Sequence, residues 1–343
     1  MIKVCSARYN HNVEEISLTS IQLDWCNTEF KKRFKNGAWQ IAPLKVEASH
    51  RHFYRATPQS PSDRPLVLMA SPPTLERNDQ FVALQSVFSA HHIPVPQIQA
   101  QDRELGLFLL SDLGQQDLEA CYATPLKDEA IQCAIKMLHI IDPVRDPALD
   151  DYDESRLRME LGLFDDWFVS GLLAQSDLKL PADALDRLVS AILVQPKSCV
   201  HRDYHCRNLL YQNDTLGIVD FQDALIGAAL YDLASLLHDC YYEFSSAEID
   251  RWLDFYLQDS AHFQHLDPKE VRALLDFTAI QRQLKAIGIF ARLQLRDQKS
   301  SHLTHIQPLL HRLINLLTRY PELEPLKMQL INCIKPAARV LSR

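Results

Sequence analysis

The 343-residue sequence predicts an α+β protein with a small β-rich N-terminal lobe and a larger helical C-terminal lobe. Before residue 112, short segments rich in β-forming residues are separated by prolines and polar turns. After residue 114, apolar residues recur with the spacing of amphipathic helices. A chain of this length is also too long to fold around one small hydrophobic core. We therefore expect one lobe at residues 1–114, hinge included, and the other at 115–343.

Four segments of the first lobe share short length, β-forming residues and flanking turn residues, which predicts strands at 39–46, 52–56, 65–70 and 106–111. Residues 57–65 form a loop in this prediction, because their prolines cannot donate ladder hydrogen bonds. One helix is expected at about 79–90, where large apolar residues fall on one face. A short connector near 111–116 leads into the second lobe.

The second lobe is predicted to consist of long amphipathic helices. Apolar residues from Leu233 to Tyr241 follow helical spacing, which predicts one helix that continues through Tyr241. The same spacing recurs at 306–314. Residues 152–168 are also expected to form one helix, which would carry Glu160 and Trp167.

Composition excludes several classes of protein. The net charge is −8, with no basic block beyond residues 31–33, so we expect no nucleic-acid partner. No run approaches the roughly 20 apolar residues that span a bilayer, and the N-terminus lacks a signal-like apolar stretch. The 8 cysteines are scattered, without a C-x-x-C pair, which fits a reducing compartment. We expect a cytoplasmic protein without a membrane partner; the oligomeric state stays open.

The stretch VHRDYHCRNLLYQNDTLGIVDFQD, at 200–223, carries the strongest functional pattern. Phosphoryl transfer from a nucleotide needs a carboxylate that orients the acceptor hydroxyl, and oxygen ligands that hold magnesium. Asp203 is the candidate base and Asn208 a candidate metal ligand. Two short strands around the polar turn at 212–215 would form a hairpin that returns Asp220 beside Asn208 as a second ligand.

His201 and His205 permit a different interpretation, a zinc site. No third ligand accompanies them at helical spacing, and H-E-x-x-H is absent, so this alternative is weak. We expect the two histidines to brace the loop by hydrogen bonds instead. H-x-D alone is a common pattern, and only its combination with Asn208, the hairpin and Asp220 indicates phosphotransfer.

At these residues the sequence resembles a known family. HRDYHCRN, VDFQD and YDLASLL are similar to the aminoglycoside phosphotransferase family, whose members are relatives of protein kinases. With EASHRHFYR, VLMASPP, DLG and ELGLFDDWF, the resemblance extends to the anomeric N-acetylmuramate/N-acetylglucosamine kinases of bacterial cell-wall recycling. It runs in order from about residue 20 to 325.

The resemblance implies a two-lobed protein-kinase-like fold that uses ATP and Mg2+. The N-terminal lobe would bind the nucleotide, with the backbone of Ser111 and Leu113 contacting adenine, and the C-terminal lobe would carry the catalytic and acceptor-binding residues. Asp203 would be the catalytic base, while Asn208 and Asp220 would hold magnesium. Asp232 would brace the catalytic loop, although an N-cap of the following helix is an equal alternative.

Two positions depart from the wider superfamily. The phosphate-covering loop VEASHRHF has no glycine, so the small residues Ala48 and Ser49 would approach the phosphates. Met69 stands near the place of the phosphate-pairing lysine. Arg51 or Arg55 is our candidate for the missing positive charge; the alternative is an arginine on an exposed strand face.

The acceptor is expected to be a small molecule, most consistent with an amino sugar. Glu160 would hydrogen-bond sugar hydroxyls, whereas Trp167 fits the core better than a sugar face. Arg207 and Asp223 flank the catalytic residues and are further candidates. Arg207 would meet an acceptor carboxylate, such as the lactyl group of N-acetylmuramate.

Three functions remain open from the sequence. The first is a kinase that converts a cell-wall amino sugar to its 1-phosphate, and the second is an aminoglycoside- or choline-type phosphotransferase, which the acidic clusters at 151–154 and 165–166 permit. The third is a catalytically silent nucleotide-binding scaffold. A protein kinase is disfavoured because VDFQDALIGAAL runs straight into YDLASLL, which leaves no room for a long peptide-docking segment. A P-loop GTPase or ATPase is excluded because G-x-x-x-x-G-K-[ST] is absent. The choice between ATP and GTP stays open.

Overall fold

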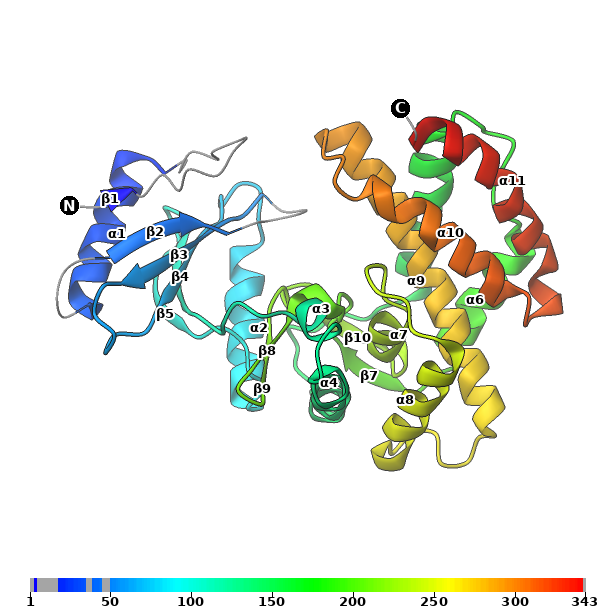
Figure 1. Cartoon of the computed structure of the whole chain (residues 1–343), viewed down its shortest axis with the longest axis horizontal. Helices are drawn as coiled ribbons and strands as arrows, with labels where there is room; N and C mark the ends of the chain where they lie inside the picture. The colour runs from blue at the N-terminus through cyan, green and yellow to red at the C-terminus, as the bar shows by residue number, and fades with distance from the viewer. Residues whose placement is uncertain (1–2, 5–17, 35–38, 45–49, 342–343) are drawn as a thin grey trace. The chain divides into compact units, whose positions relative to one another are not determined.

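The computed structural model describes residues 3–4, 18–34, 39–44 and 50–341. Their contacts divide the chain into two compact units. Unit 1 comprises residues 1–115 and 217–222, and unit 2 comprises 116–216 and 223–343. Figure 1 shows the helices and strands of both units in chain order. No helix among the described residues combines the length and apolarity needed to span a membrane.

Unit 1 is built on a six-stranded sheet of order β1-β2-β3-β4-β6-β5. Its strands are β1 Lys3–Val4, β2 Trp39–Pro43, β3 His52–Pro58, β4 Leu66–Ala70, β5 Ile98–Asp102 and β6 Leu107–Ser111. β1 runs parallel to β2, and the other neighbours are antiparallel. The four predicted strands are confirmed with small shifts of their ends. β1 and β5 were not predicted, because two residues and the polar sequence IQAQD give little strand signal.

Two helices complete unit 1, α1 (Ser20–Arg33) and α2 (Asn78–Ala90). The second confirms the predicted helix at 79–90. The first escaped prediction, because its apolar residues do not gather on one face and only Cys26 and Phe30 are buried. Thr19 begins it with a capping box, in which its side chain accepts from the backbone N–H of Gln22.

Unit 2 is mainly helical, with α3 Leu118–Cys121, α4 Lys127–Ile141, α5 Glu154–Leu163, α6 Ala182–Leu193, α7 Tyr231–Leu237, α8 Ser246–Asp259, α9 Pro268–Asp297, α10 Leu303–Leu317 and α11 Glu324–Leu341. A π-helix, Phe164–Leu172, continues α5, and short 3-10 turns occur at Cys206–Asn208 and Pro321–Leu323. β7 Lys197–Val200 pairs with β10 Leu225–Ala228, and β8 Leu209–Gln212 pairs with β9 Thr215–Ile218.

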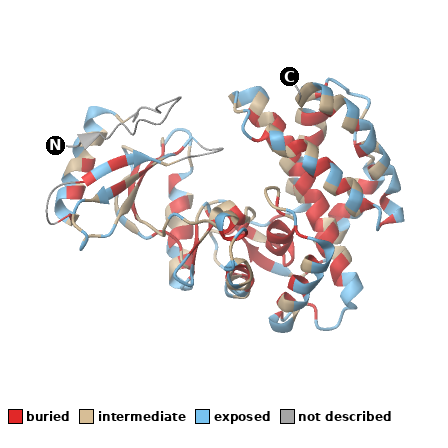
Figure 2. Ribbon diagram, viewed as in Figure 1, coloured by how far each residue is buried: buried red, intermediate tan, exposed pale blue. Residues whose placement is uncertain are grey.

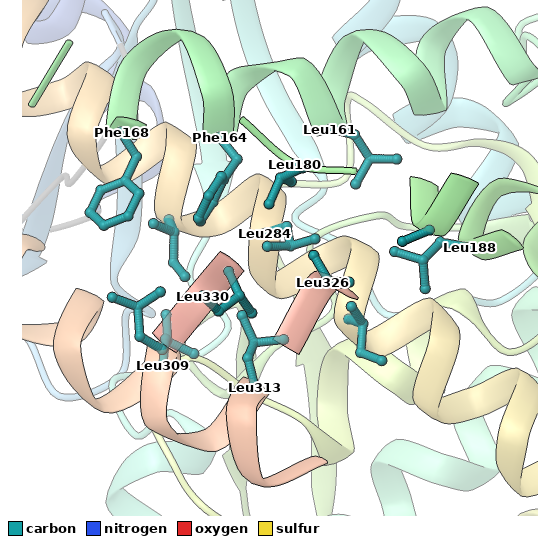
Figure 3. Close-up of a cluster of buried hydrophobic side chains, with 14 of the residues drawn as sticks. Leu161, Phe164, Phe168, Leu180, Leu188, Leu284, Leu309, Leu313, Leu326 and Leu330 are labelled. Carbon is teal, nitrogen blue, oxygen red and sulfur yellow. The ribbon is translucent and has the colours of Figure 1, made fainter. Parts of the chain in front are cut away.

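The core of unit 2 surrounds α9, which lies against α5, the π-helix, α6, α7 and α10. Buried leucines and phenylalanines from α5, the π-helix, α6, α10 and α11 pack around Leu284 of α9 (Figure 3). Figure 2 shows buried residues along α9 and throughout α7. α9 approaches its neighbours closely, because a Cβ on Gly288 would lie 2.4 Å from the carbonyl carbon of Leu163. These contacts hold α5, which carries Glu160, against α9, which carries Gln281 and Lys285.

One of the helix predictions was wrong at its end. The helix predicted to continue through Tyr241 stops at Leu237, because the Asp239 carboxylate accepts the backbone N–H groups of Cys206 and Tyr241, each at 2.8 Å. These bonds hold the segment after α7 in a non-helical path against the catalytic loop. The helix predicted at 152–168 is confirmed from Glu154 onward, α-helical to Leu163 and then continuing as a π-helix. The helix expected at 306–314 is confirmed as α10.

Candidate active site

Residues 201–208 form a loop between β7 and β8, which we call the catalytic loop. The Asp232 carboxylate, in the first turn of α7, accepts the backbone N–H groups of His201 at 2.5 Å and of Arg202 at 2.9 Å. Arg202 has a φ of 76°, a left-handed conformation that is uncommon for a residue other than glycine. The alternative that Asp232 caps its helix is wrong, because Leu230 occupies the N-cap.

Asp203 follows the strained Arg202 and is half-buried. Among the described residues, its carboxylate makes no hydrogen bond or ion pair, so both oxygens are free to receive a ligand. Burial by itself would raise the pKa of the Asp203 carboxyl, but Lys285, Arg282 and Arg202 outweigh burial and hold this pKa well below its ordinary value. Asp203 is therefore ionised at neutral pH.

Asn208 turns back onto the same loop. Its Nδ2 donates to the backbone oxygen of Asp203 at 3.0 Å and lies 3.4 Å from His205 Nε2. Because the amide nitrogen is engaged in the loop, Oδ1 is the atom of Asn208 that remains for a cation. The His205 ring packs edge-on against Tyr241, and the fully buried His201 packs in the same way against Tyr204.

The predicted hairpin is confirmed as β8 and β9. Its two turn residues, Asn213 and Asp214, have φ values of 51° and 57°, as a two-residue type I′ turn requires. Asp220 follows β9 with a φ of 63° and is exposed, and Gln222 Nε2 donates to its Oδ1 at 2.6 Å. The neighbouring Phe221 stacks on Phe81 of α2 within unit 1.

Arg51 and Arg55 both lie in unit 1 and are both engaged. Arg51 is 3% exposed, with Nε 3.2 Å from Ser71 Oγ and a terminal nitrogen 3.4 Å from the Glu76 carboxylate.

Arg55, on β3, donates to both carboxylate oxygens of Asp112, at 2.6 and 3.1 Å, and to the Gly114 carbonyl at 2.8 Å. The alternative of arginines on an exposed strand face is therefore wrong for both.

The other nucleotide-side residues fall at the end of β6 and in the connector. The Ser111 N–H donates to the Gln97 carbonyl at 2.9 Å, whereas the Leu113 N–H makes no hydrogen bond within the described part of the chain. Met69 on β4 is buried. Ala48 and Ser49 lie outside the described residues.

The residues expected to contact the acceptor differ in their surroundings. Arg207 Nε donates to Glu119 of α3 at 2.6 Å, and its guanidinium lies 3.6 Å from the centre of the Tyr241 ring. Asp223 is exposed, and its carbonyl accepts from Arg202 at 3.3 Å. Glu160 is only 3% exposed, and both of its oxygens bind protein groups. A buried carboxylate of this kind does not present an oxygen to an acceptor.

Sequence reasoning missed three cations that surround Asp203, namely Arg202, Arg282 and Lys285. Two of them lie on α9, in the segment QRQLKAIG. A signal was available there: Gln281, Arg282 and Lys285 interrupt the apolar face of a helix that is otherwise buried. Polar residues at such positions need partners, because burial of an unpaired charge is costly.

An unbonded carboxylate on a braced loop, followed by an asparagine and a hairpin, fits what phosphoryl transfer to a hydroxyl group requires. The chain belongs to the phosphotransferase enzyme family, whose model matches residues 40–274. It is therefore a phosphotransferase of the kinase type with a hydroxyl acceptor.

Similar proteins match most of the chain. An N-acetylmuramate/N-acetylglucosamine kinase of Pseudomonas putida is 32% identical over 316 residues, which cover 88% of this chain and 92% of that protein. A kinase of the same name from Pseudomonas aeruginosa is 34% identical over 84% of this chain and 86% of its own. One from Neisseria meningitidis is 30% identical, over 91% of this chain and 94% of its own.

Solved structures share the fold. Ethanolamine kinase of Plasmodium vivax superposes with a TM-score of 0.63 at 9% identity, covering 88% of this chain and 92% of that one. Amicoumacin kinase, solved in complex with AMP-PNP and Ca2+, gives a TM-score of 0.61 at 15% identity, covering 88% and 95%. Identities this low show the fold alone. They confirm the predicted α+β, two-lobed, protein-kinase-like fold class.

Proposed function

We propose that this protein is an ATP- and Mg2+-dependent kinase that phosphorylates the anomeric hydroxyl of N-acetylmuramate and N-acetylglucosamine. The products would be the sugar 1-phosphate and ADP. The free, ionised carboxylate of Asp203 on a braced loop carries the reaction type. The amino-sugar acceptor rests on the relatives named for these sugars, which match this chain over most of both lengths. We place the reaction in the cytoplasm, because ATP is an intracellular substrate.

Asp203 would accept a hydrogen bond from the anomeric hydroxyl and orient its oxygen toward the γ-phosphorus. A new bond forms between that oxygen and phosphorus, the bridging bond to the β-phosphate breaks, and ADP takes the electron pair. The hydroxyl proton passes to Asp203. Because its pKa is low, Asp203 serves mainly to position the hydroxyl, and it takes the proton late in the transfer.

Asn208 and Asp220 would hold Mg2+. Oxygen donors suit this ion: Asp220 offers an exposed carboxylate, and Asn208 retains Oδ1 because its Nδ2 is bound within the loop. Bound Mg2+ would supply neutralisation of phosphate charge. His201, His205 and Asp232 would keep the loop in place, which the bonds from Asp232 to two loop amides support.

On the nucleotide side, we assign adenine to the backbone of Ser111 and Leu113, and the phosphates to Ser49 with Arg51 or Arg55. The unengaged N–H of Leu113 supports the first assignment. Arg55 is the stronger of the two arginines, because its side chain is 14% exposed, against 4% for Arg51.

For the acceptor, we retain Arg207 and Asp223. An acceptor carboxylate would share the Arg207 guanidinium with Glu119, which already holds its Nε. Glu160, by contrast, is replaced in this role, because both oxygens are bound within the protein and the residue is 3% exposed. We assign it a different task below.

The test is ADP release with Mg2+ and ATP, for wild type and Asp203→Asn, in the presence of N-acetylmuramate, N-acetylglucosamine, kanamycin, choline or buffer alone. We expect turnover with the two amino sugars, lowered by about 10²–10⁴-fold in the variant. Turnover only with kanamycin or choline would instead establish the aminoglycoside- or choline-type alternative. ATP binding without turnover on any acceptor would favour the silent scaffold.

A further inference from the structure

Glu160 lies at the centre of a buried group of charges in unit 2. Its Oε1 binds the terminal nitrogen of Arg202 and lies 3.2 Å from Lys285 Nζ. Its Oε2 accepts from the Tyr152 hydroxyl, which lies 2.9 Å from the Tyr231 hydroxyl, and from Gln281 at 3.5 Å. Each lone pair that an acceptor could use is thus occupied from inside the protein.

The hydrophobic core of unit 2 holds this buried group of charges in place. Glu160 precedes Leu161 on α5, and Lys285 follows Leu284 on α9, and both leucines belong to the cluster drawn in Figure 3. The two helices pack directly on one another. Glu160 therefore provides a fixed anionic anchor, whereas the loop that it binds consists of irregular backbone.

Arg202 connects this anchor to Asp203. Its backbone N–H is bound by Asp232, its backbone oxygen accepts from Arg282, and its side chain is bound by Glu160. The residue occupies left-handed backbone, where a side chain is strained unless its surroundings hold it. Asp203 is the next residue, so a movement of Arg202 displaces the Asp203 carboxylate directly.

Glu160 also affects which cations are available to pair with Asp203. Arg202, Arg282 and Lys285 all lie within electrostatic reach of Asp203, yet they make no ion pair with it among the described residues. Glu160 takes up Arg202 and Lys285, which leaves the Asp203 oxygens free. After Glu160, Asp203 is the next carboxylate that acts on Arg202 and on Lys285. Without the Glu160 charge, pairing of these cations with Asp203 would occupy the oxygens needed for the acceptor hydroxyl.

We propose that Glu160 is a positioning residue for phosphoryl transfer, which keeps Asp203 in place and unpaired by holding the side chain of Arg202. The inference rests on the proposed function for its catalytic readout. It assigns to α5 a role in the rate of the transfer step, not in the affinity for acceptor or ATP.

Unit 2 contains a matched control in Asp276. This carboxylate is also fully buried, and it accepts from an arginine, Arg272 Nε at 2.9 Å, and from a tyrosine, Tyr320 Oη at 2.6 Å. None of its partners belongs to the catalytic loop. Asp276→Asn and Glu160→Gln therefore remove the same kind of buried charge, and only Glu160→Gln removes one that binds Arg202.

The experiment compares kcat and KM of wild type, Glu160→Gln, Asp276→Asn, Arg202→Gln and the double variant Glu160→Gln/Arg202→Gln, at a temperature where each is folded. We expect Glu160→Gln to lower kcat at least tenfold, while the KM values for acceptor and for ATP stay within about twofold of wild type. Asp276→Asn should lower the melting temperature, while its kcat stays within about twofold of wild type. The double variant should be no slower than the slower single variant, as for residues that act through one another. Glu160→Asp, which keeps the charge, should recover part of kcat.

Several results would overturn the proposal: an unchanged kcat in Glu160→Gln, an equal loss in Asp276→Asn, a loss confined to KM, or additive losses in the double variant. Amide hydrogen exchange of peptides covering 199–208 adds a readout without acceptor, with faster exchange expected in Glu160→Gln and wild-type exchange in Asp276→Asn. If wild type shows no turnover on amino sugars, the proposed function fails, and the exchange comparison alone decides the role of Glu160. Should Glu160→Gln not fold, Arg202→Gln reports on the same link.

Discussion

Asp203 illustrates how neighbouring residues set the chemistry of one side chain. Burial and three cations act on its carboxyl in opposite directions, and the cations prevail, so the pKa falls. The same cations would bind it if they lacked other partners. Glu160 supplies that partner, and its own pKa is lowered because Lys285 and Arg202 outweigh its burial. The ionisation of Asp203 therefore depends on the surrounding charges and not on this residue alone.

Arg207 provides a prediction about acceptor choice. Arg207→Ala should raise the KM for N-acetylmuramate about tenfold more than that for N-acetylglucosamine, because only the first sugar carries a carboxylate for the guanidinium. Steady-state kinetics with both sugars measure the ratio. The matched variant Glu119→Gln keeps Arg207 but frees its Nε from an ionised partner, so it should lower the KM for N-acetylmuramate. Equal changes for both sugars in Arg207→Ala would refute the assignment.

Arg55 provides a prediction about ATP. Arg55→Ala should raise the KM for ATP about tenfold, because it removes a half-buried cation and the bonds that tie β3 to Asp112 and Gly114. ATP titrations at saturating acceptor measure this effect. Arg51→Ala is the parallel variant, since Arg51 is bound to Ser71 and Glu76 instead. If neither variant changed the KM for ATP, the phosphate-binding role of these arginines would be excluded.

At the scale of elements, α9 is the central helix of unit 2, against which α5, the π-helix, α6, α7 and α10 pack. It buries residues on most of its circumference. It brings Arg282 to the catalytic loop, and Gln281 and Lys285 to Glu160. Its close approach to the end of α5 requires Gly288, because the backbone of Leu163 occupies the space of a side chain. The close packing of α5 and α9 at this crossing thus sets the positions of Glu160 and Lys285 relative to each other.

Gly288→Ala should lower the free energy of unfolding by about 1–3 kcal/mol, because the added methyl group meets backbone that cannot rotate away. Urea unfolding followed by circular dichroism measures the change. Gly162→Ala on α5 is the control, since its Cβ would meet no atom within 4 Å, and it should raise the free energy of unfolding by about 0.5–1 kcal/mol. Equal effects of the two substitutions would contradict this account of the helix crossing.

The whole molecule joins a six-stranded sheet in unit 1 to a helical unit 2. Unit 1 contains the arginines and the connector proposed for ATP, and unit 2 contains the catalytic loop with its charge cluster. Under the proposed function, turnover would need both sets of residues together with a divalent cation, so the prediction about the cation concerns the complete protein.

Removal of divalent cations with EDTA should abolish turnover, and added Mg2+ should restore it in the wild type. Asn208→Ala should raise the Mg2+ concentration needed for half-maximal rate about tenfold or more, because it removes one oxygen ligand. Rates across a Mg2+ titration at fixed ATP give both values. The control is Gln212→Ala, an exposed residue at the end of β8 that should leave the titration unchanged. Full activity in EDTA would contradict the proposed metal dependence.

The sequence by itself determined the features that depend on local residue order. It gave the four strands at 39–111, the helix α2 and the hairpin, because alternation, helical spacing and turn residues act over a few positions. The motif with Asp203 and Asn208 was readable for the same reason, since both lie on one short loop.

Only the tertiary structure decided which distant groups meet. Glu160 and Lys285 lie far from residue 202 in the sequence, and burial between packed helices brings their charges to Arg202 and turns an expected acceptor contact into an internal anchor. The helix α7 ends at Leu237 rather than at Tyr241, because Asp239 binds the backbone of the catalytic loop. Such choices depend on the pairing of buried polar groups across the fold, which no local pattern encodes.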